Sequence, residues 1–177
     1  GNFAGDEFVI APGAFLMELT NKLGLKLPLM PGKGYSFLYN PPSDVKLNHA
    51  ALLLEAKVAV TPMDGKIRFG GTMELGSPNN KIYQNRVEGI VNSIPKYLKN
   101  LSVDYPKQDI WYGYRPCTPD GLPYLGRVSK YENIAIAAGA GMMGLSLGPA
   151  MGKAISQILS NRKFETDISV FSPDRFE

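Results

Sequence analysis

The sequence predicts an α+β fold, and three features of its residue pattern carry this prediction. Strand-like runs separated by turn residues fill the first half of the chain, and one long amphipathic helix follows them. A strand of small residues, a glycine-rich loop and a second helix come near the end. The strands before the long helix favour an antiparallel or mixed sheet.

Length and composition limit the possible classes of protein. The chain has 177 residues, of which 44% are hydrophobic and 20% charged, with a net charge of +3. This length suits one ordinary domain with a piece of a second, and the nine tyrosines and eight phenylalanines argue against disorder. Because the basic residues are scattered, we expect no nucleic-acid partner. A single cysteine, Cys117, and a single histidine, His49, exclude an internal disulfide and a Cys/His zinc cluster.

Turn residues divide the first half of the chain into short elements. We expect strands at residues 6–11, 35–39, 45–54, 57–61 and 66–70, the first of them buried. The Asp64-Gly65 pair between the last two strands is typical of a β-hairpin turn. Residues 14–23 carry apolar side chains on one helical face and Gly24 follows them, so we expect a short helix there.

The second half contains the clearest helix. Apolar residues recur at spacings of three and four between Asn80 and Asn100, which predicts a helix that is kinked or broken at Pro95. We expect strands at residues 110–114, 133–138 and 168–171, and a helix at 146–159. Pro149 is compatible with that helix only in its first turn. The uncharged stretch 134–152 is long enough to span a bilayer, but its glycines and Pro149 indicate a strand, a loop and a helix start instead.

The loop Gly139-Ala140-Gly141-Met142-Met143-Gly144 matches the pattern G-x-G-x-x-G between a strand and a helix. A dinucleotide-binding domain that began here would need further strand–helix units, and too little chain follows. Glycines nevertheless let another group approach the backbone, and the amides at a helix N-terminus attract an electron-rich edge. The alternative is that Gly144, Gly148 and Gly152 only permit tight packing of the helix on the sheet.

Three segments, followed by the glycine loop, carry a resemblance to a known family. They are Val9-Ile10-Ala11-Pro12-Gly13-Ala14, Lys33-Gly34-Tyr35-Ser36, and the run WYGYRPCTPDGLPYLG at 111–126. Together they resemble the C-terminal half of the FAD-dependent D-amino-acid oxidase superfamily, most closely its D-amino-acid dehydrogenase and glycine oxidase branches. The resemblance covers nearly the whole chain.

The resemblance implies a domain organisation. Residues 1–24 would be a fragment of an FAD-binding α/β domain, residues 25–109 the substrate-binding domain, and residues 110–177 the return into the FAD-binding domain. The N-terminal dinucleotide segment of that domain is absent, which makes it the expected partner. Because the chain starts without Met, we expect a piece of a longer protein that alone neither holds FAD tightly nor turns over. Its oligomeric state stays open.

The resemblance also implies site residues. Arg115 would bind the substrate carboxylate, since a guanidinium fork suits both oxygens, and an ion pair with Asp120 is the alternative. Tyr35 and Met143 would line the substrate pocket. The expected FAD contacts are Gly13, Gly139, Gly141, Met142, Gly144, Leu145 and Ser146, where Ser146 has helix N-capping as its structural alternative. FAD is expected to be non-covalent, because the family's anchoring cysteine would align near Gly113 rather than at Cys117.

The expected activity is oxidation of a D-amino acid or related amine to an imine and then a 2-oxo acid, by hydride transfer to flavin. Such chemistry depends on orientation and electrostatics, so no catalytic acid or base is assigned. The alternatives are a non-catalytic binding or assembly module and another flavin dehydrogenase acting on a 2-hydroxy acid or glycerol phosphate. We expect a cytoplasmic protein, with peripheral attachment to the inner membrane as the alternative.

Overall fold

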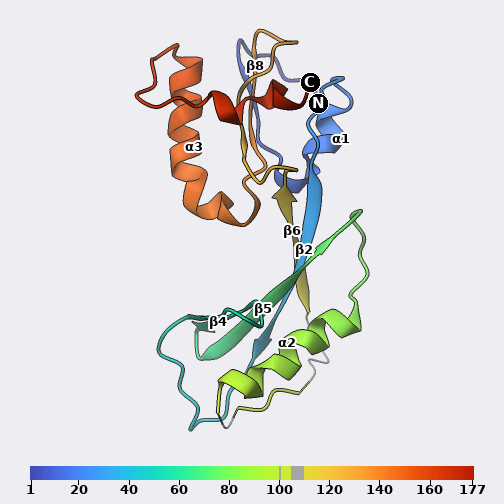
Figure 1. Ribbon diagram of the computed structural model, residues 1–177, viewed down its shortest axis with the longest axis vertical. Coiled ribbons are helices and arrows are strands. Elements are labelled where there is room, and N and C mark those ends of the chain that lie inside the picture. Colours follow the sequence, from blue (N-terminus) through green and yellow to red (C-terminus); the bar gives the residue numbers. More distant parts are fainter. Residues whose placement is uncertain (100, 105–109) are drawn as a thin grey trace. The chain divides into compact units, whose positions relative to one another are not determined.

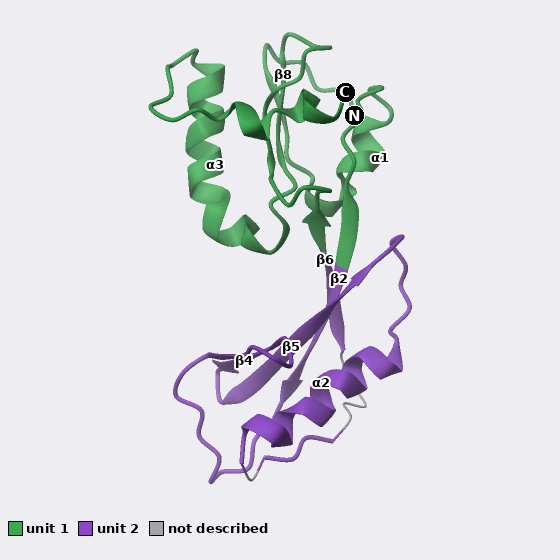
Figure 2. Ribbon diagram, in the orientation of Figure 1, with its two compact units in different colours: residues 1–32, 115–177 green, residues 33–114 purple. Residues whose placement is uncertain are grey.

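The computed structural model describes residues 1–99, 101–104 and 110–177. The chain forms two compact units (Figures 1 and 2). Unit 1 contains residues 1–32 and 115–177, and unit 2 contains residues 33–114. The predicted domain boundaries lie after residues 24 and 109, and the second of these falls at the edge of the undescribed residues. The functional assignment of the two units stays a prediction.

Unit 2 is built on a five-stranded sheet with the order β3-β4-β5-β2-β6. Its strands are β2 (Met30–Tyr39), β3 (Ala51–Leu53), β4 (Val58–Met63), β5 (Lys66–Leu75) and β6 (Trp111–Cys117), of which β2 and β6 continue into unit 1. The predicted hairpin is confirmed, because β4 and β5 pair up to Met63 and Lys66 and the intervening Asp64 and Gly65 both have positive φ angles. The strand predicted over 45–54 is wrong except at β3, since Lys46, Asn48 and His49 are poor strand formers.

The helix α2 (Gln84–Tyr97) covers one face of this sheet (Figure 1). Its buried residues Val87, Ile90, Val91 and Ile94 belong to one core with sheet residues such as Phe37, Val58 and Phe69. The helix runs unbroken through Pro95, so the predicted break is wrong. Pro95 lies in the last turn, where the amide of Leu98 still donates to the carbonyl of Ile94 at 2.9 Å.

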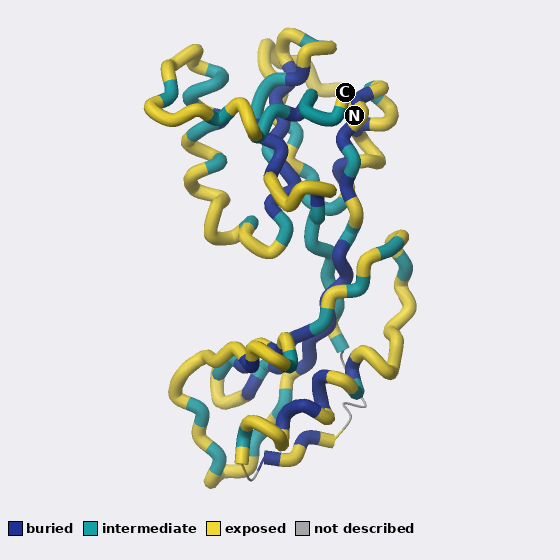
Figure 3. Tube along the Cα trace, viewed as in Figure 1, coloured by how far each residue is buried: buried dark blue, intermediate teal, exposed yellow. Residues whose placement is uncertain are grey.

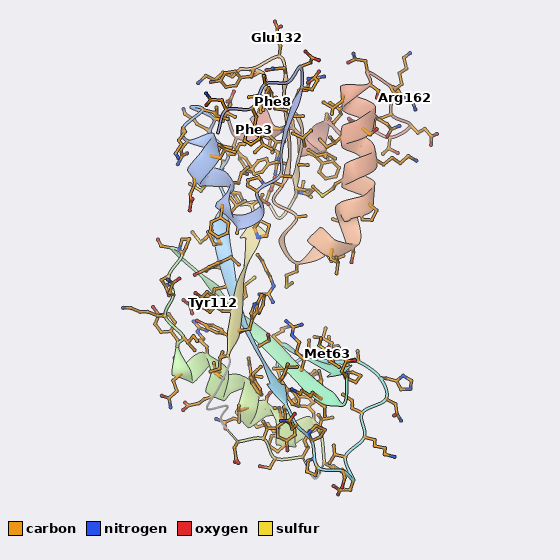
Figure 4. The ribbon with its side chains drawn as sticks, turned by 180° about the vertical axis from the view of Figure 1, so that it is seen from behind. Phe3, Phe8, Met63, Tyr112, Glu132 and Arg162 are labelled. Carbon is orange, nitrogen blue, oxygen red and sulfur yellow. The ribbon has the colours of Figure 1, made fainter. Side chains whose placement is uncertain are left out.

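Unit 1 contains a mixed three-stranded sheet with the order β1-β8-β7. The strand β8 (Ile134–Ala138) lies in the centre, parallel to β1 (Phe8–Ile10) and antiparallel to β7 (Tyr124–Arg127). The prediction that the first strand is buried is wrong, because β1 is an edge strand with one partner. Phe8, labelled in Figure 4, is 36% exposed, and Val9 is 44% exposed.

Helices lie against this sheet. The short helix α1 (Leu16–Thr20) follows a 3₁₀ turn at Gly13–Phe15 and ends earlier than predicted. The helix α3 (Gly144–Leu159) begins two residues earlier than predicted, so Pro149 lies in its second turn and the expectation of a first-turn proline is wrong. The missing N–H of Pro149 then removes one hydrogen bond near the start of the helix. Only Ile155 of α3 is buried (Figure 3).

The chain ends in two 3₁₀ turns, Ser169–Phe171 and Pro173–Phe176, so the strand predicted over 168–171 is wrong. Side-chain oxygens of Asp167 and Ser172 accept backbone N–H groups two residues ahead, which favours turns over a strand. Within the described parts of the chain, no helix combines the length and apolar character needed to cross a membrane.

Candidate functional site

The end of β8 is a bend that only glycine can make. Gly139 has a φ of +80°, and a Cβ atom there would lie 2.6 Å from Cγ2 of Thr118 and 3.2 Å from Cδ2 of Tyr124. Two cross-strand pairs flank the bend: Tyr124 with Ala138, and Cys117 with Ala140. A side chain at this position would therefore strain the backbone and collide with the neighbouring segment.

The bend leads directly into the start of α3. Gly141, with a φ of +55°, opens a 3₁₀ turn in which the amide of Met143 donates to the carbonyl of Ala140 at 2.9 Å. Met143 is the N-cap residue of α3 and makes no side-chain capping bond. The alternative of Ser146 as N-cap is therefore wrong, since Ser146 is the third residue of the helix. The amides at the N-terminus of α3 carry partial positive charge.

A hollow of about 390 Å³ lies beside this bend, within unit 1. Its helical wall is formed by Gly144, Gly148, Met151, Gly152 and Ile155; the rest is Val9, Ala11, Gly13, Pro116 and residues 137–140. A Cβ atom added to Gly148 or Gly152 would meet nothing within 4 Å. Tight helix–sheet packing therefore does not explain these two glycines. The open space beside them leaves room for another group to approach the backbone of the helix.

Arg115 lies in β6, at the start of the motif R-P-C-T-P-D-G-L-P. Its Nη1 atom is buried and has no hydrogen-bond partner among the described residues. A buried guanidinium donor without an acceptor costs about 1–3 kcal/mol, which an anionic ligand would offset. The predicted alternative of an ion pair with Asp120 is wrong, because Asp120 pairs with Arg175, at 2.8 Å from Nε to Oδ2.

The other predicted site residues lie in three places: around the hollow, in the adjoining turn and first helical turn, and in unit 2. Gly13, Gly139 and Gly144 line the hollow, and Gly141, Met142, Met143, Leu145 and Ser146 form the adjoining turn and first helical turn. Leu145 is 96% exposed, and Met142 and Met143 are exposed as well. Tyr35 belongs to the other unit, where it is a core residue with only 2% of its surface exposed. Burial, together with its hydrogen bond to Glu74, raises the pKa of Tyr35 to about 12.

Sequence reasoning missed a buried lysine next to Tyr35. Lys33 is 2% exposed, and its Nζ atom donates to the carbonyl oxygens of Asn79 and Lys81 while lying 4.4 Å from the ring centroid of Tyr112. The ammonium is thus paired with carbonyls and aromatic faces, as a buried charge requires. The only signal in the sequence was its place in the segment Lys33-Gly34-Tyr35-Ser36.

Comparison with known proteins shows the family of the chain. A family model described as FAD dependent oxidoreductase matches residues 1–158. The chain belongs to this family. Over 178 aligned residues it is 32% identical to a D-amino acid dehydrogenase of Bradyrhizobium diazoefficiens, covering 99% of this chain and 42% of the relative. The chain therefore spans less than half the length of that relative.

Solved structures of the family have the same fold. Glycine oxidase from Geobacillus kaustophilus superposes with a TM-score of 0.82 at 26% identity, covering 99% of this chain and 47% of that one. Iminodiacetate oxidase from Chelativorans sp. BNC1 superposes with a TM-score of 0.84, covering 97% of this chain and 47% of that one. At 23% identity the second likeness concerns the fold alone. The family membership confirms the predicted resemblance and the predicted fold class.

Two glycine substitutions test the different roles of glycine at the bend and beside the hollow. We expect Gly139→Ala to lower the free energy of unfolding by about 2–4 kcal/mol, because it combines a positive φ with a close contact. Gly148→Ala should leave stability unchanged or raise it by up to about 1 kcal/mol, since alanine favours the helix and the space is open. Chemical denaturation of the two variants measures both values. Equal losses in the two variants would contradict the assignment.

The Asp120–Arg175 pair predicts a pH dependence of stability. Hydrogen bonds from Arg175 lower the pKa of Asp120 from 3.8 to about 2. The ionised pair therefore stabilises the fold above pH 4, and this contribution is lost as the pH falls through about 2. We expect Asp120→Asn to lower the melting temperature by about 2–4 °C at pH 6, and the two melting temperatures to converge toward pH 2. Substitution of the exposed Asp6 by Asn is the control, and a gap that persists unchanged at pH 2 would contradict the pairing.

Proposed function

We propose that the chain is the substrate- and flavin-contacting part of an FAD-dependent oxidoreductase that oxidises a D-amino acid or a related amine. Its relatives are named D-amino acid dehydrogenase and glycine oxidase, which supports an amino acid as the substrate class. Oxidation of the amine produces an imine, which water hydrolyses to a 2-oxo acid with release of ammonia, or of an amine where the substrate is a secondary amine. The expectation of a cytoplasmic protein, with peripheral membrane attachment as the alternative, stays a prediction.

The buried, unpartnered Nη1 of Arg115 is the observation that carries this proposal. In our proposal the guanidinium binds the substrate carboxylate, because its planar fork offers two parallel N–H groups to two oxygens. Such binding fixes the α-carbon and limits the orientations that the amine can adopt. Fixed orientation can supply much of the rate enhancement when no proton transfer by a side chain is required.

We propose that the hollow beside Gly139 receives the isoalloxazine ring of FAD. Its walls are small and apolar, and the first-turn amides of α3 at Gly144, Leu145 and Ser146 suit the electron-rich pyrimidine edge of the ring. Bound FAD supplies the acceptor for the hydride of the α-carbon. None of the described residues that line the hollow has a titratable side chain, so in our proposal the hollow binds and orients the ring and supplies no acid or base.

We propose that FAD is held without a covalent bond. Cys117 is partly buried, and its thiol lies 3.6 Å from the carbonyl oxygen of Arg115. The cysteine that anchors flavin in relatives would align near Gly113 and not at Cys117. Denaturation with acid should release all of the flavin from the protein.

We further propose that the N-terminal dinucleotide segment of the family completes unit 1. The sheet has an open edge at β1, where Phe8 and Val9 are exposed, and α3 buries only Ile155. Leu145 and Leu147 add exposed apolar surface to this helix. Apolar surface of this extent indicates a covering element, and the relatives contain more chain than this one matches.

Substitution of Arg115 tests the proposed function. The complete protein, loaded with FAD, is assayed with a panel of D-amino acids and a dye as the electron acceptor. We expect Arg115→Ala to lower kcat/KM by about 10²–10³, mainly through KM, and Arg115→Lys to restore part of it because the charge returns without the fork. Arg127→Lys, which changes an arginine elsewhere in unit 1, is the control. An unchanged KM in Arg115→Ala, or a protein that binds no flavin, would refute the proposal.

A further inference from the structure

One arginine, Arg175, connects the last 3₁₀ turn of the chain to the loop at residues 118–122 through hydrogen bonds. A guanidinium has five N–H donors, and this side chain makes five hydrogen bonds. The acceptors are Oδ1 and Oδ2 of Asp120 and the carbonyl oxygens of Leu122, Phe171 and Ser172, at 2.7–3.4 Å. Arg175 therefore uses all five of its N–H donors, and these hydrogen bonds join residues 171–175 to the loop at residues 118–122.

Arg175 also contacts aromatic rings. Its guanidinium carbon lies 4.3 Å from the ring centroid of Tyr124 and 4.8 Å from that of Phe176. Tyr124 is fully buried, and its hydroxyl donates to the carbonyl of Pro28 at 2.7 Å. Stacking on a guanidinium on one side and a hydrogen bond at its tip fix the position of this ring.

The side chains of Thr118 and Tyr124 lie against the bend at Gly139. Thr118 and Tyr124 are the two residues whose side chains would collide with a Cβ atom at Gly139. The hydroxyl of Thr118 donates to the carbonyl of Leu122 at 2.8 Å, and this carbonyl also accepts from Arg175 at 2.7 Å. A continuous series of contacts thus leads from Arg175, through Leu122 and Thr118, to the backbone of Gly139.

A second arginine of unit 1, Arg127, also forms an ion pair and serves as a comparison for Arg175. Arg127 donates to both carboxylate oxygens of Glu7, each at 2.7 Å, and to the carbonyl oxygen of Glu132 at 2.8 Å. Arg127 pairs with Ala135 in the sheet, at the opposite end of β7 from Tyr124, which pairs with Ala138 next to the bend. The two arginines therefore offer a matched comparison between one that reaches the bend and one that does not.

We propose that Arg175 is a positioning residue for the glycine loop: it holds Thr118 and Tyr124 against Gly139 and so sets the geometry of residues 139–146. The consequence for flavin binding rests on the proposed function, whereas the positioning itself does not. The C-terminal turns thereby belong to the active-site architecture of the protein, although they carry no ligand contact of their own.

Hydrogen–deuterium exchange tests the positioning without FAD. In the complete protein, we expect Arg175→Met to speed the exchange of backbone amides in a peptide covering residues 137–146 by about tenfold. Arg127→Met should leave this peptide unchanged and affect the start of β1, the end of β7 and the turn that contains Glu132. Equal exchange in both variants, whether raised or not, would overturn the proposal. If Arg175→Met does not fold, Arg175→Lys and Asp120→Asn replace it under the same criterion.

Flavin titration then tests the consequence. We expect Arg175→Met to weaken FAD binding by about tenfold and to shift the visible spectrum of the bound flavin, with no such change in Arg127→Met. A wild-type protein that binds no FAD would refute the proposed function, while the exchange measurement still decides the positioning. FAD binding and spectra that are the same in both variants would overturn the link to the cofactor.

Discussion

The bend at Gly139 is the constraint on which the rest of unit 1 depends. Within a few residues the strand β8 ends, the backbone bends through a 3₁₀ turn, and the helix α3 begins. This is possible because Gly139 and Gly141 both adopt positive φ angles and because Gly139 has no side chain to displace Thr118 and Tyr124. The hollow, the helix N-terminus and the neighbouring motif strand all take their positions from this bend.

The glycines of the loop and helix serve two different purposes. At Gly139 the chain itself fills the space that a side chain would need, so glycine is required for folding. At Gly148 and Gly152 the space is open, so glycine has no folding benefit and costs helix stability. A residue that weakens a helix without an internal packing reason indicates that another group comes close to the backbone. The family membership makes FAD and the family's dinucleotide segment the natural candidates.

Much of this architecture could be predicted from local patterns. The hairpin at Asp64-Gly65 followed from turn chemistry, and α2 from the spacing of Val87, Ile90 and Ile94. Two predictions failed because the outcome depended on a distant partner. The exposure of β1 follows from its edge position, and the partner of Asp120 is Arg175, which lies 55 residues away in the chain. No periodic pattern encodes such a pairing. The strand expected over residues 168–171 failed for a local reason, because side-chain hydrogen bonds to the backbone favour turns there.

A crystal structure of the complete protein with FAD tests the central claim most directly. We expect the oxygens of the pyrimidine ring to lie about 2.7–3.2 Å from the backbone nitrogens of Gly144, Leu145 or Ser146. The ring should lie beside Gly139, with the Nη1 atom of Arg115 directed toward the substrate position. A flavin bound elsewhere, with the hollow beside Gly139 filled by protein side chains, would contradict the claim that this bend exists to receive the cofactor.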